Sequence, residues 1–305
     1  MLVVEALLRA WRVGDPKWRL RLRLVPLAAP LLLVPLFFLL APWRASAWFA
    51  TSRALFAGER WNLLRVGPAG AGDLALLLAA GLGAALFLRD ALPPLIDRLR
   101  EGPDDEAAAW LPPAALQELV ERHARRLSIP PPAVRVVRSR WPVFFAEGRR
   151  QPELVLSPAG LEALDARELD AAVAHELVHV RHGDPAWGYA LIAARAANFF
   201  NPALQWAARA VVDEIERRAD HGVVEAGLGG ADALASAIVK LFDRSHPAPG
   251  SGTALDRVAR RVRQVGIERR RERLVSVLPA APLAFGWLRL ALASGGLAAL
   301  LYFVV

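Results

Sequence analysis

Two histidines and a glutamate form a compact chemical pattern in this sequence. In the stretch AAVAHELVHVRHGD, residues 171–184, His175 and His179 lie four positions apart and Glu176 follows the first of them. Positions i and i+4 share one face of a helix, so both imidazoles can reach a single cation. Glu176 is offset by one residue, which aims it at the open coordination position of that metal. The pattern therefore indicates a general base beside a metal-bound water, unless it is a chance feature of a buried helix.

A third ligand would decide between these readings, because catalytic zinc takes three protein ligands. The chain has no cysteine, so any ligand must be His, Asp or Glu. The segment EIERRAD, residues 214–220, offers Glu216 and Asp220 one helical turn apart. Glu216 would complete a His, His, Glu set for one Zn²⁺ per chain, and Asp220 would accept a hydrogen bond from a ligand histidine. Glu214 is the alternative ligand, and a surface ion pair with a neighbouring arginine is the alternative role for Glu216.

The composition points to a membrane. The chain has 305 residues, a net charge of +8 and 55% hydrophobic residues. Its basic residues cluster beside apolar runs, as at 19–23 and 269–273, which is typical of membrane flanks. A nucleic-acid-binding face is a weaker explanation of the charge, since the arginines follow the apolar segments. We therefore expect membrane lipid and no nucleic acid among the partners.

The apolar runs predict about three transmembrane helices. Residues 24–43 carry no charge over a length that can span the hydrocarbon core, although their prolines favour kinks. In the C-terminal run, Arg289 must reach toward the membrane surface. The distribution of Lys and Arg favours a cytoplasmic N-terminus and central domain. The predicted order is an interfacial amphipathic segment (1–23), a transmembrane segment (24–43), an external loop (44–69), a second transmembrane segment (70–92), a cytoplasmic zinc metallopeptidase domain (93–275) and a C-terminal transmembrane segment (276–305).

The central domain is predicted to be α+β and mostly helical, with a small sheet. Asp165 and Glu168 form a capping box at the start of the motif helix, which Gly183 ends. Short apolar runs bounded by turn residues predict three strands. The expected elements are helices at 111–128, 165–183 and 202–226, and strands within 133–139, 142–148 and 152–158.

The pair of motifs, HELVH followed by ERRAD, resembles the membrane-bound gluzincin metallopeptidases. The BlaR/MecR antirepressor peptidases and the group of HtpX and CAAX prenyl proteases are the most similar, and the likeness covers roughly residues 110–275. It implies a zincin-like domain with His175, His179 and Glu216 as zinc ligands. By the same resemblance Glu176 is the general base, and Asp220 is the aspartate behind the ligands.

Two features differ from these groups. HtpX-like chains carry a pair of transmembrane helices between the two motifs, whereas residues 185–212 here are too short and too polar for such a pair. BlaR-type receptors continue into a β-lactam-binding domain, and this sequence ends at Val305. We therefore expect no β-lactam sensing within the chain, and a separate sensor or regulatory subunit as a partner.

Other residues carry weaker hypotheses. The stretch VFFAE resembles the edge strand along which gluzincin substrates pair, which makes Phe144, Phe145 and Ala146 candidate substrate contacts; a plain core strand is the alternative. His246 and Arg257 are candidate oxyanion contacts, against a surface or capping role. Of the remaining polar residues, we expect His182 and Asp184 to be structural, His123 to be solvated and His221 to be a packing residue.

These inferences predict a zinc endopeptidase integral to a bacterial inner membrane. It would hydrolyse peptide bonds of a protein or peptide substrate, in regulatory proteolysis or in quality control of membrane proteins. The alternative is a catalytically inactive, zinc-stabilised membrane scaffold that recruits partners.

Overall fold

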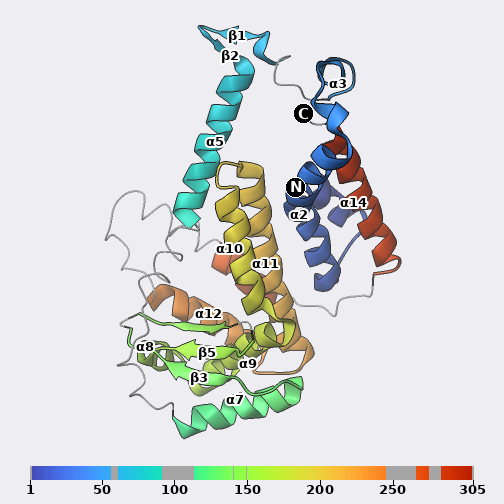
Figure 1. The fold of residues 1–305 in the computed structure, drawn as a ribbon. Coiled ribbons are helices and arrows are strands. Elements are labelled where there is room, and N and C mark those ends of the chain that lie inside the picture. Colours follow the sequence, from blue (N-terminus) through green and yellow to red (C-terminus); the bar gives the residue numbers. More distant parts are fainter. Residues whose placement is uncertain are drawn as a thin grey trace. The chain divides into compact units, whose positions relative to one another are not determined.

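The computed structural model describes residues 2–55, 61–90, 113–139, 141–148, 150–244, 266–274 and 283–303 (Figure 1). It divides into two compact units, and the division falls inside helices α10 (Asp184–Ala197) and α11 (Pro202–Glu225). The predictions for His246 and Arg257 lie outside the described residues. Unit 1 comprises Met1–Leu99, Leu191–Glu214 and Ala280–Val305, and unit 2 comprises Arg100–Ala190 and Ile215–Pro279.

Unit 1 is built almost entirely from helices. Two of them are long and apolar enough to cross a membrane, Pro16–Leu40 and Ala71–Arg89, and the apolar helix α14 is shorter. With the small sheets, the predicted mostly helical α+β class is confirmed. The elements are α1 (Leu2–Ala10), α2 (Pro16–Leu40), η1 (Pro42–Ala45), α3 (Ala47–Ser52), the short strands β1 (Arg65–Val66) and β2 (Ala69–Gly70), α5 (Ala71–Asp90) and α14 (Gly286–Tyr302).

Helix α2 is continuous from an amphipathic start into an apolar body. It begins at Pro16, where the Asp15 side chain accepts a hydrogen bond from the Lys17 amide (2.8 Å). The expected division between residues 23 and 24 is therefore not a helix boundary. Three prolines lie inside α2 without ending it, as membrane helices tolerate when neighbouring elements satisfy the freed carbonyls.

Helix α14 packs along α2. The contact is close at Gly286, where an added Cβ would lie 2.3 Å from Trp18 Cε2. Arg289 of α14 donates a hydrogen bond to the Trp11 carbonyl (3.1 Å). The C-terminal apolar helix is thus held to α2 by packing and to the turn between α1 and α2 by a hydrogen bond from Arg289.

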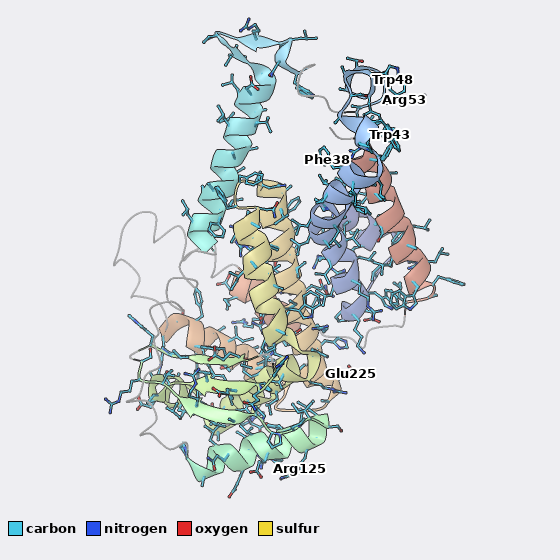
Figure 2. The ribbon with its side chains drawn as sticks, in the orientation of Figure 1. Phe38, Trp43, Trp48, Arg53, Arg125 and Glu225 are labelled. Atoms are coloured by element: carbon cyan, nitrogen blue, oxygen red, sulfur yellow. The ribbon has the colours of Figure 1, made fainter. Side chains whose placement is uncertain are left out.

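Large aromatic side chains gather where α2 ends. Phe38, Trp43 and Trp48 are each more than half exposed there (Figure 2). Exposed tryptophans at the end of an apolar helix are typical of the interface between a bilayer and water. This distribution agrees with α2 as a membrane segment.

Unit 2 contains a three-stranded sheet in the order β3-β5-β4. The strands β3 (Ala133–Val136) and β5 (Glu153–Leu156) are parallel, and β4 (Phe144–Glu147) pairs antiparallel with β5. All three lie inside the predicted apolar runs. Within the described residues β4 therefore forms one edge of this sheet.

Helix α9 (Ala166–His182) is the centre of unit 2. Its capping box is formed by Asp165 and Glu168, and Gly183 ends it with a φ of 71°, as predicted from the sequence. Its Ala- and Leu-rich face is buried, because α7 (Ala114–Leu127) and α12 (Ala231–Arg244) pack on it and β4 lies against it. Two shorter helices in the described part of this unit are α8 (Pro158–Ala163) and a helix over residues 266–274.

Two glycines let the chain of α11 approach α9. A Cβ on Gly222 would lie 2.7 Å from Val178 Cγ1, so a larger residue would force the helices apart. After α11, Gly229 has a φ of +66° and lies against the backbone of Ala171, where an added Cβ would be 2.3 Å from Cα. This close packing brings the second motif beside the first.

We expect Glu168 to contribute to stability in a pH-dependent way. The side chain is 4% exposed; burial favours the neutral carboxyl, but bonds from Lys240, Ser236 and the Asp165 amide together lower its pKa from 4.5 to about 2. Because the folded pKa is depressed, the stabilisation is complete above pH 4.5 and is lost as the pH falls toward 2. Glu168→Gln should lower the free energy of unfolding by about 2 kcal/mol near neutral pH.

Thermal unfolding of the detergent-solubilised protein checks this prediction. Glu121→Gln is the matched control, since Glu121 is exposed and pairs only one turn away with Arg125. Two outcomes would contradict the stabilising role of Glu168. One is an equal loss of melting temperature in both variants. The other is a difference in melting temperature between Glu168→Gln and the wild-type protein that does not shrink as the pH falls from 4.5 to 2.

Candidate metal centre

His175, His179 and Glu216 converge between α9 and α11. The two Nε2 atoms are 3.0 Å apart, and Glu216 oxygens lie 3.5 Å from His175 Nε2 and 3.7 Å from His179 Nε2. A tetrahedral zinc with ligand distances near 2.0–2.1 Å requires ligand atoms about 3.3 Å from one another. These three residues are the group in the described part of the chain that could hold a metal. Their donor set and spacing fit zinc.

Both histidines are buried, and each faces a carboxylate with its other ring nitrogen. His179 Nδ1 lies 2.9 Å from Asp184 Oδ2, and His175 Nδ1 lies 3.3 Å from Asp220 Oδ1. A carboxylate in this position holds the N–H on Nδ1 and leaves Nε2 free for a metal. Only the contact of Asp184 with His179 is a hydrogen bond, and the role expected of Asp220 stays a prediction.

Asp184, expected to be structural, also contacts the candidate metal centre. It is 7% exposed and also forms a close ion pair with Arg218 of α11. The residue stands just past the end of α9, after Gly183, and folds back onto the last turn of that helix. Asp184 and His179 are not on one face of a single helix, so helical spacing does not predict their contact. The only signal in the sequence is the turn at Gly183, which ends α9 between them.

Arg270 is a part of the centre that sequence reasoning missed. Its basic run was read as a membrane flank, yet its guanidinium binds both Asp220 oxygens (2.6 and 2.9 Å) and Glu216 (2.8 Å). It also lies 3.0 Å from His175 Nε2. Its positive charge offsets the negative charges of these neighbouring carboxylates. Arg270 and a metal ion therefore share the same partners.

The electrostatics of the centre favour positive charge. Burial alone would lower the pKa of His179, but the Asp184 hydrogen bond and the charges of Glu216 and Glu176 raise it to about 9. Burial would raise the pKa of Glu216, yet Arg270 and the two histidines hold it well below its usual range. An environment that keeps a proton on a buried imidazole also stabilises a bound cation.

Glu176 is half-buried and turns toward the sheet edge. Its Oε2 accepts a hydrogen bond from the Ala146 amide of β4 (2.9 Å). Of the three edge-strand candidates, Ala146 is thus beside the centre, while Phe144 packs against the core and Phe145 pairs with Val155 of β5. The hydrogen bond between Glu176 and the Ala146 amide thus places the candidate metal centre next to the edge strand β4.

Of the other histidines that the structure describes, His123 and His221 have bonding partners outside the metal centre. His123 was expected to be solvated, and this is wrong: it is 2% exposed and bonds Asp170 of α9 (3.0 Å). Its burial lowers its pKa despite that partner. His182 also has a lowered pKa, about 4, because it is buried and near Arg218. His221 lies 3.8 Å from Glu225, one turn along α11.

Glu214, the alternative third ligand, belongs to a different cluster. Its side chain is fully buried in unit 1, where it pairs with Arg19 (3.1 Å) and closely with Arg23 of α2. Arg23 also binds Glu5 of α1 (2.9 Å). Glu214 and Glu216 are thus only two residues apart on α11, but Glu214 forms ion pairs with α2 whereas Glu216 belongs to the candidate metal centre.

Comparison with known proteins supports the same chemistry. Residues 119–245, from α7 to the end of α12, match the sequence model of the family described as BlaR1 peptidase M56. The resemblance to the BlaR and HtpX group is confirmed. The matched residues contain both motifs of the centre, HELVH on α9 and ERRAD on α11. The family is thus described as one of peptidases, and the chain resembles it in the part that carries His175, His179 and Glu216.

Three curated relatives illustrate the extent of the likeness. Protease HtpX of Idiomarina loihiensis is 28% identical over 203 residues, which is 62% of this chain and 66% of that protein. The HtpX homologue of Campylobacter concisus is 32% identical over 114 residues (36% and 38%), and that of Acidiphilium cryptum is 40% identical over 67 residues (21% and 23%). The chain thus spans from less than a quarter to about two thirds of these relatives. No solved structure matches the chain.

The two glutamates of α11 allow a matched test of the ligand set. Glu216→Gln should lose bound zinc, with an affinity loss beyond the roughly 10–100-fold typical of residues behind a ligand. Glu214→Gln should keep one zinc per chain and instead lower the melting temperature, because it leaves Arg19 and Arg23 facing an uncharged partner. Metal analysis of purified proteins and titration with a competing chelator measure both. Zinc loss in Glu214→Gln with retention in Glu216→Gln would assign the ligand to Glu214.

Proposed function

We infer that this protein is a membrane-embedded zinc endopeptidase. The observation that carries the proposal is the His175, His179 and Glu216 triangle with Glu176 at its side, beside an edge strand. The resemblance to metallopeptidases in residues 119–245 supports it independently. We assign the ligand roles to these three residues and the general base to Glu176.

The residues of the chain divide the chemistry among them. When bound, zinc would polarise a peptide carbonyl and lower the pKa of its water. Glu176 would take a proton from the attacking water and pass it to the leaving amine. Asp184 and Asp220 would hold the ligand imidazoles in the tautomer that donates from Nδ1, and this needs no proton transfer from them.

The edge strand is the proposed substrate platform. Strand β4 has one neighbour in the described sheet, and the Ala146 amide meets Glu176 on its other side. An extended peptide that pairs with such an edge is aligned by main-chain bonds, and its scissile carbonyl comes near the centre. We therefore propose a protein or peptide substrate bound in extended form. Signalling by regulated cleavage and clearance of damaged membrane proteins are both compatible with it.

We further propose that the protein resides in a bacterial inner membrane, with the peptidase domain within residues 93–275 facing the cytoplasm. The two long apolar helices and the placement of Lys and Arg support this orientation. It assigns Arg53 to the outside and Arg125 to the cytoplasm, both exposed (Figure 2). A regulatory partner would be a separate chain.

Single cysteines test the orientation, because the chain has none of its own. Arg53→Cys should react with a membrane-impermeant maleimide added to intact cells. Arg125→Cys should react only after the cells are lysed. Labelling of Arg125→Cys in intact cells, with Arg53→Cys protected, would invert the topology.

Glu176→Gln distinguishes an enzyme from a scaffold. The substitution keeps size and hydrogen bonding but removes the base, so cleavage should fall by at least the roughly 10²–10⁴-fold that general acid–base groups contribute. Zinc content and melting temperature should stay near those of the wild-type protein. Recovery of an uncut substrate with Glu176→Gln from membranes is the direct readout. If Glu176→Gln restores a deletion strain as well as the wild type does, the protein acts as a zinc-stabilised scaffold.

A further inference from the structure

The hairpin of α10 and α11 is apolar on its outside. Between residues 191 and 212 every exposed side chain is apolar, and the first exposed charge is Asp213. Phe199, Phe200 and Trp206 are 46%, 48% and 43% exposed. A soluble helix pair shows the opposite pattern, with charged and polar residues facing solvent. The exposed residues of this segment are Ala193, Ala197, Phe199, Phe200, Ala203, Trp206 and Val212.

The polar side chains of the same hairpin are turned inward and bonded to each other. Arg195 is 8% exposed and Gln205 is fully buried. Arg195 Nε donates to Gln205 Oε1 (2.9 Å), and Gln205 Nε2 donates to the carbonyls of Arg195 (2.9 Å) and Asn198 (3.2 Å). Asn201 caps α11 through the amides of residues 203 and 204. The polar residues that argued against membrane entry in the sequence therefore make hydrogen bonds within the hairpin, as a lipid environment favours.

The tip of the hairpin lies against α5, a helix long and apolar enough to cross a membrane. An added Cβ on Gly83 would lie 2.3 Å from the Phe200 carbonyl carbon, and the rings of Phe87 and Phe199 are 6.3 Å apart. A cavity of about 680 Å³ continues this contact along α5; its lining is Asp73, Leu76, Leu77, Ala79, Ala80, Phe200, Asn201 and Pro202. Figure 1 shows the hairpin turn beside α5.

The positions of Arg89 and Arg209 indicate how far the hairpin extends along α5. Arg209 is close enough to Arg89, at the end of α5, for their charges to interact. From that level to Gly83 is about 9 Å of helix rise, which reaches part of the way into a hydrocarbon core of about 30 Å. The hairpin is thus deep enough to enter the apolar layer and too short to cross it.

We propose that residues 191–212 form a re-entrant hairpin whose exposed face is covered by lipid acyl chains. The lipid is favoured over a protein partner because the apolar face is continuous with exposed leucines of α5 and no polar side chain of residues 191–212 is exposed. The hairpin lies between the two motifs of the metal centre in the sequence. Its membrane insertion is independent of whether the centre cuts peptides.

Site-directed spin labels on single cysteines test the proposal in the full chain. Phe200→Cys is the probe position, Leu77→Cys (69% exposed on α5) is the lipid reference, and Arg125→Cys (side chain 72% exposed) is the water reference. In lipid nanodiscs both membrane faces meet solvent, so sidedness does not affect the result. Before spin labelling, a water-soluble maleimide should modify Phe200→Cys at least about tenfold more slowly than Arg125→Cys, as for Leu77→Cys.

The nitroxide at position 200 should then collide more with oxygen, which dissolves in acyl chains, than with a water-soluble nickel complex. The Arg125→Cys label should show the reverse. Fast maleimide reaction and nickel access at position 200 would overturn the proposal. Slow reaction without oxygen access would also overturn it, since a protein surface would then cover the tip. If Phe200→Cys does not fold, Ala203→Cys on the same exposed face gives the same readout.

Discussion

The close packing of α11 on α9 is the constraint on which the rest of the structure depends. Three ligand atoms from two helices lie within 4.8 Å of one another, and this is possible only where the helices nearly touch. Gly222 permits that approach against Val178, and the buried Ala219 lies on the same stretch of α11. A shift of either helix by about the width of a methyl group would separate these side-chain atoms. The geometry of the candidate metal site therefore depends on how closely α11 packs on α9.

The packing of α11 on α9 also brings several carboxylates close together. Glu216, Asp220 and Asp184 lie around two buried imidazoles, and Arg270 and Arg218 offset part of their charge. Such a cluster is stable only if its charges are paired, because burial makes an unpaired charge costly. The centre is therefore held ready for a cation by residues from three separate segments. The pairing also gives the helix at 266–274 a place in the centre, where the sequence alone suggested a membrane flank.

The two units follow different rules of polarity. In unit 2 an apolar core is covered by α7, α9 and α12, and charged residues are exposed or paired at its edge. In unit 1 the exposed residues within 24–40 of α2, 74–88 of α5 and 191–212 of the hairpin are apolar, and ionic groups such as Glu214 and Arg195 are inside. This inversion is expected where lipid replaces water as the solvent. The division between them falls inside α11, so Glu214 and Glu216 serve different environments two residues apart.

The sequence alone determined what depends on neighbouring residues. The i, i+4 spacing of HELVH, the capping box at Asp165 and the alternating apolar runs are local, so the motif helix and the strands were predictable within a few residues. Only the tertiary structure decided which distant groups meet: Asp184 behind His179, Arg270 beside Glu216, and the burial of His123. The reason is that a polar residue in a sequence does not reveal its partner. In the sequence Arg195 is a charge that opposes membrane entry, and only the fold bonds it to Gln205 inside the hairpin.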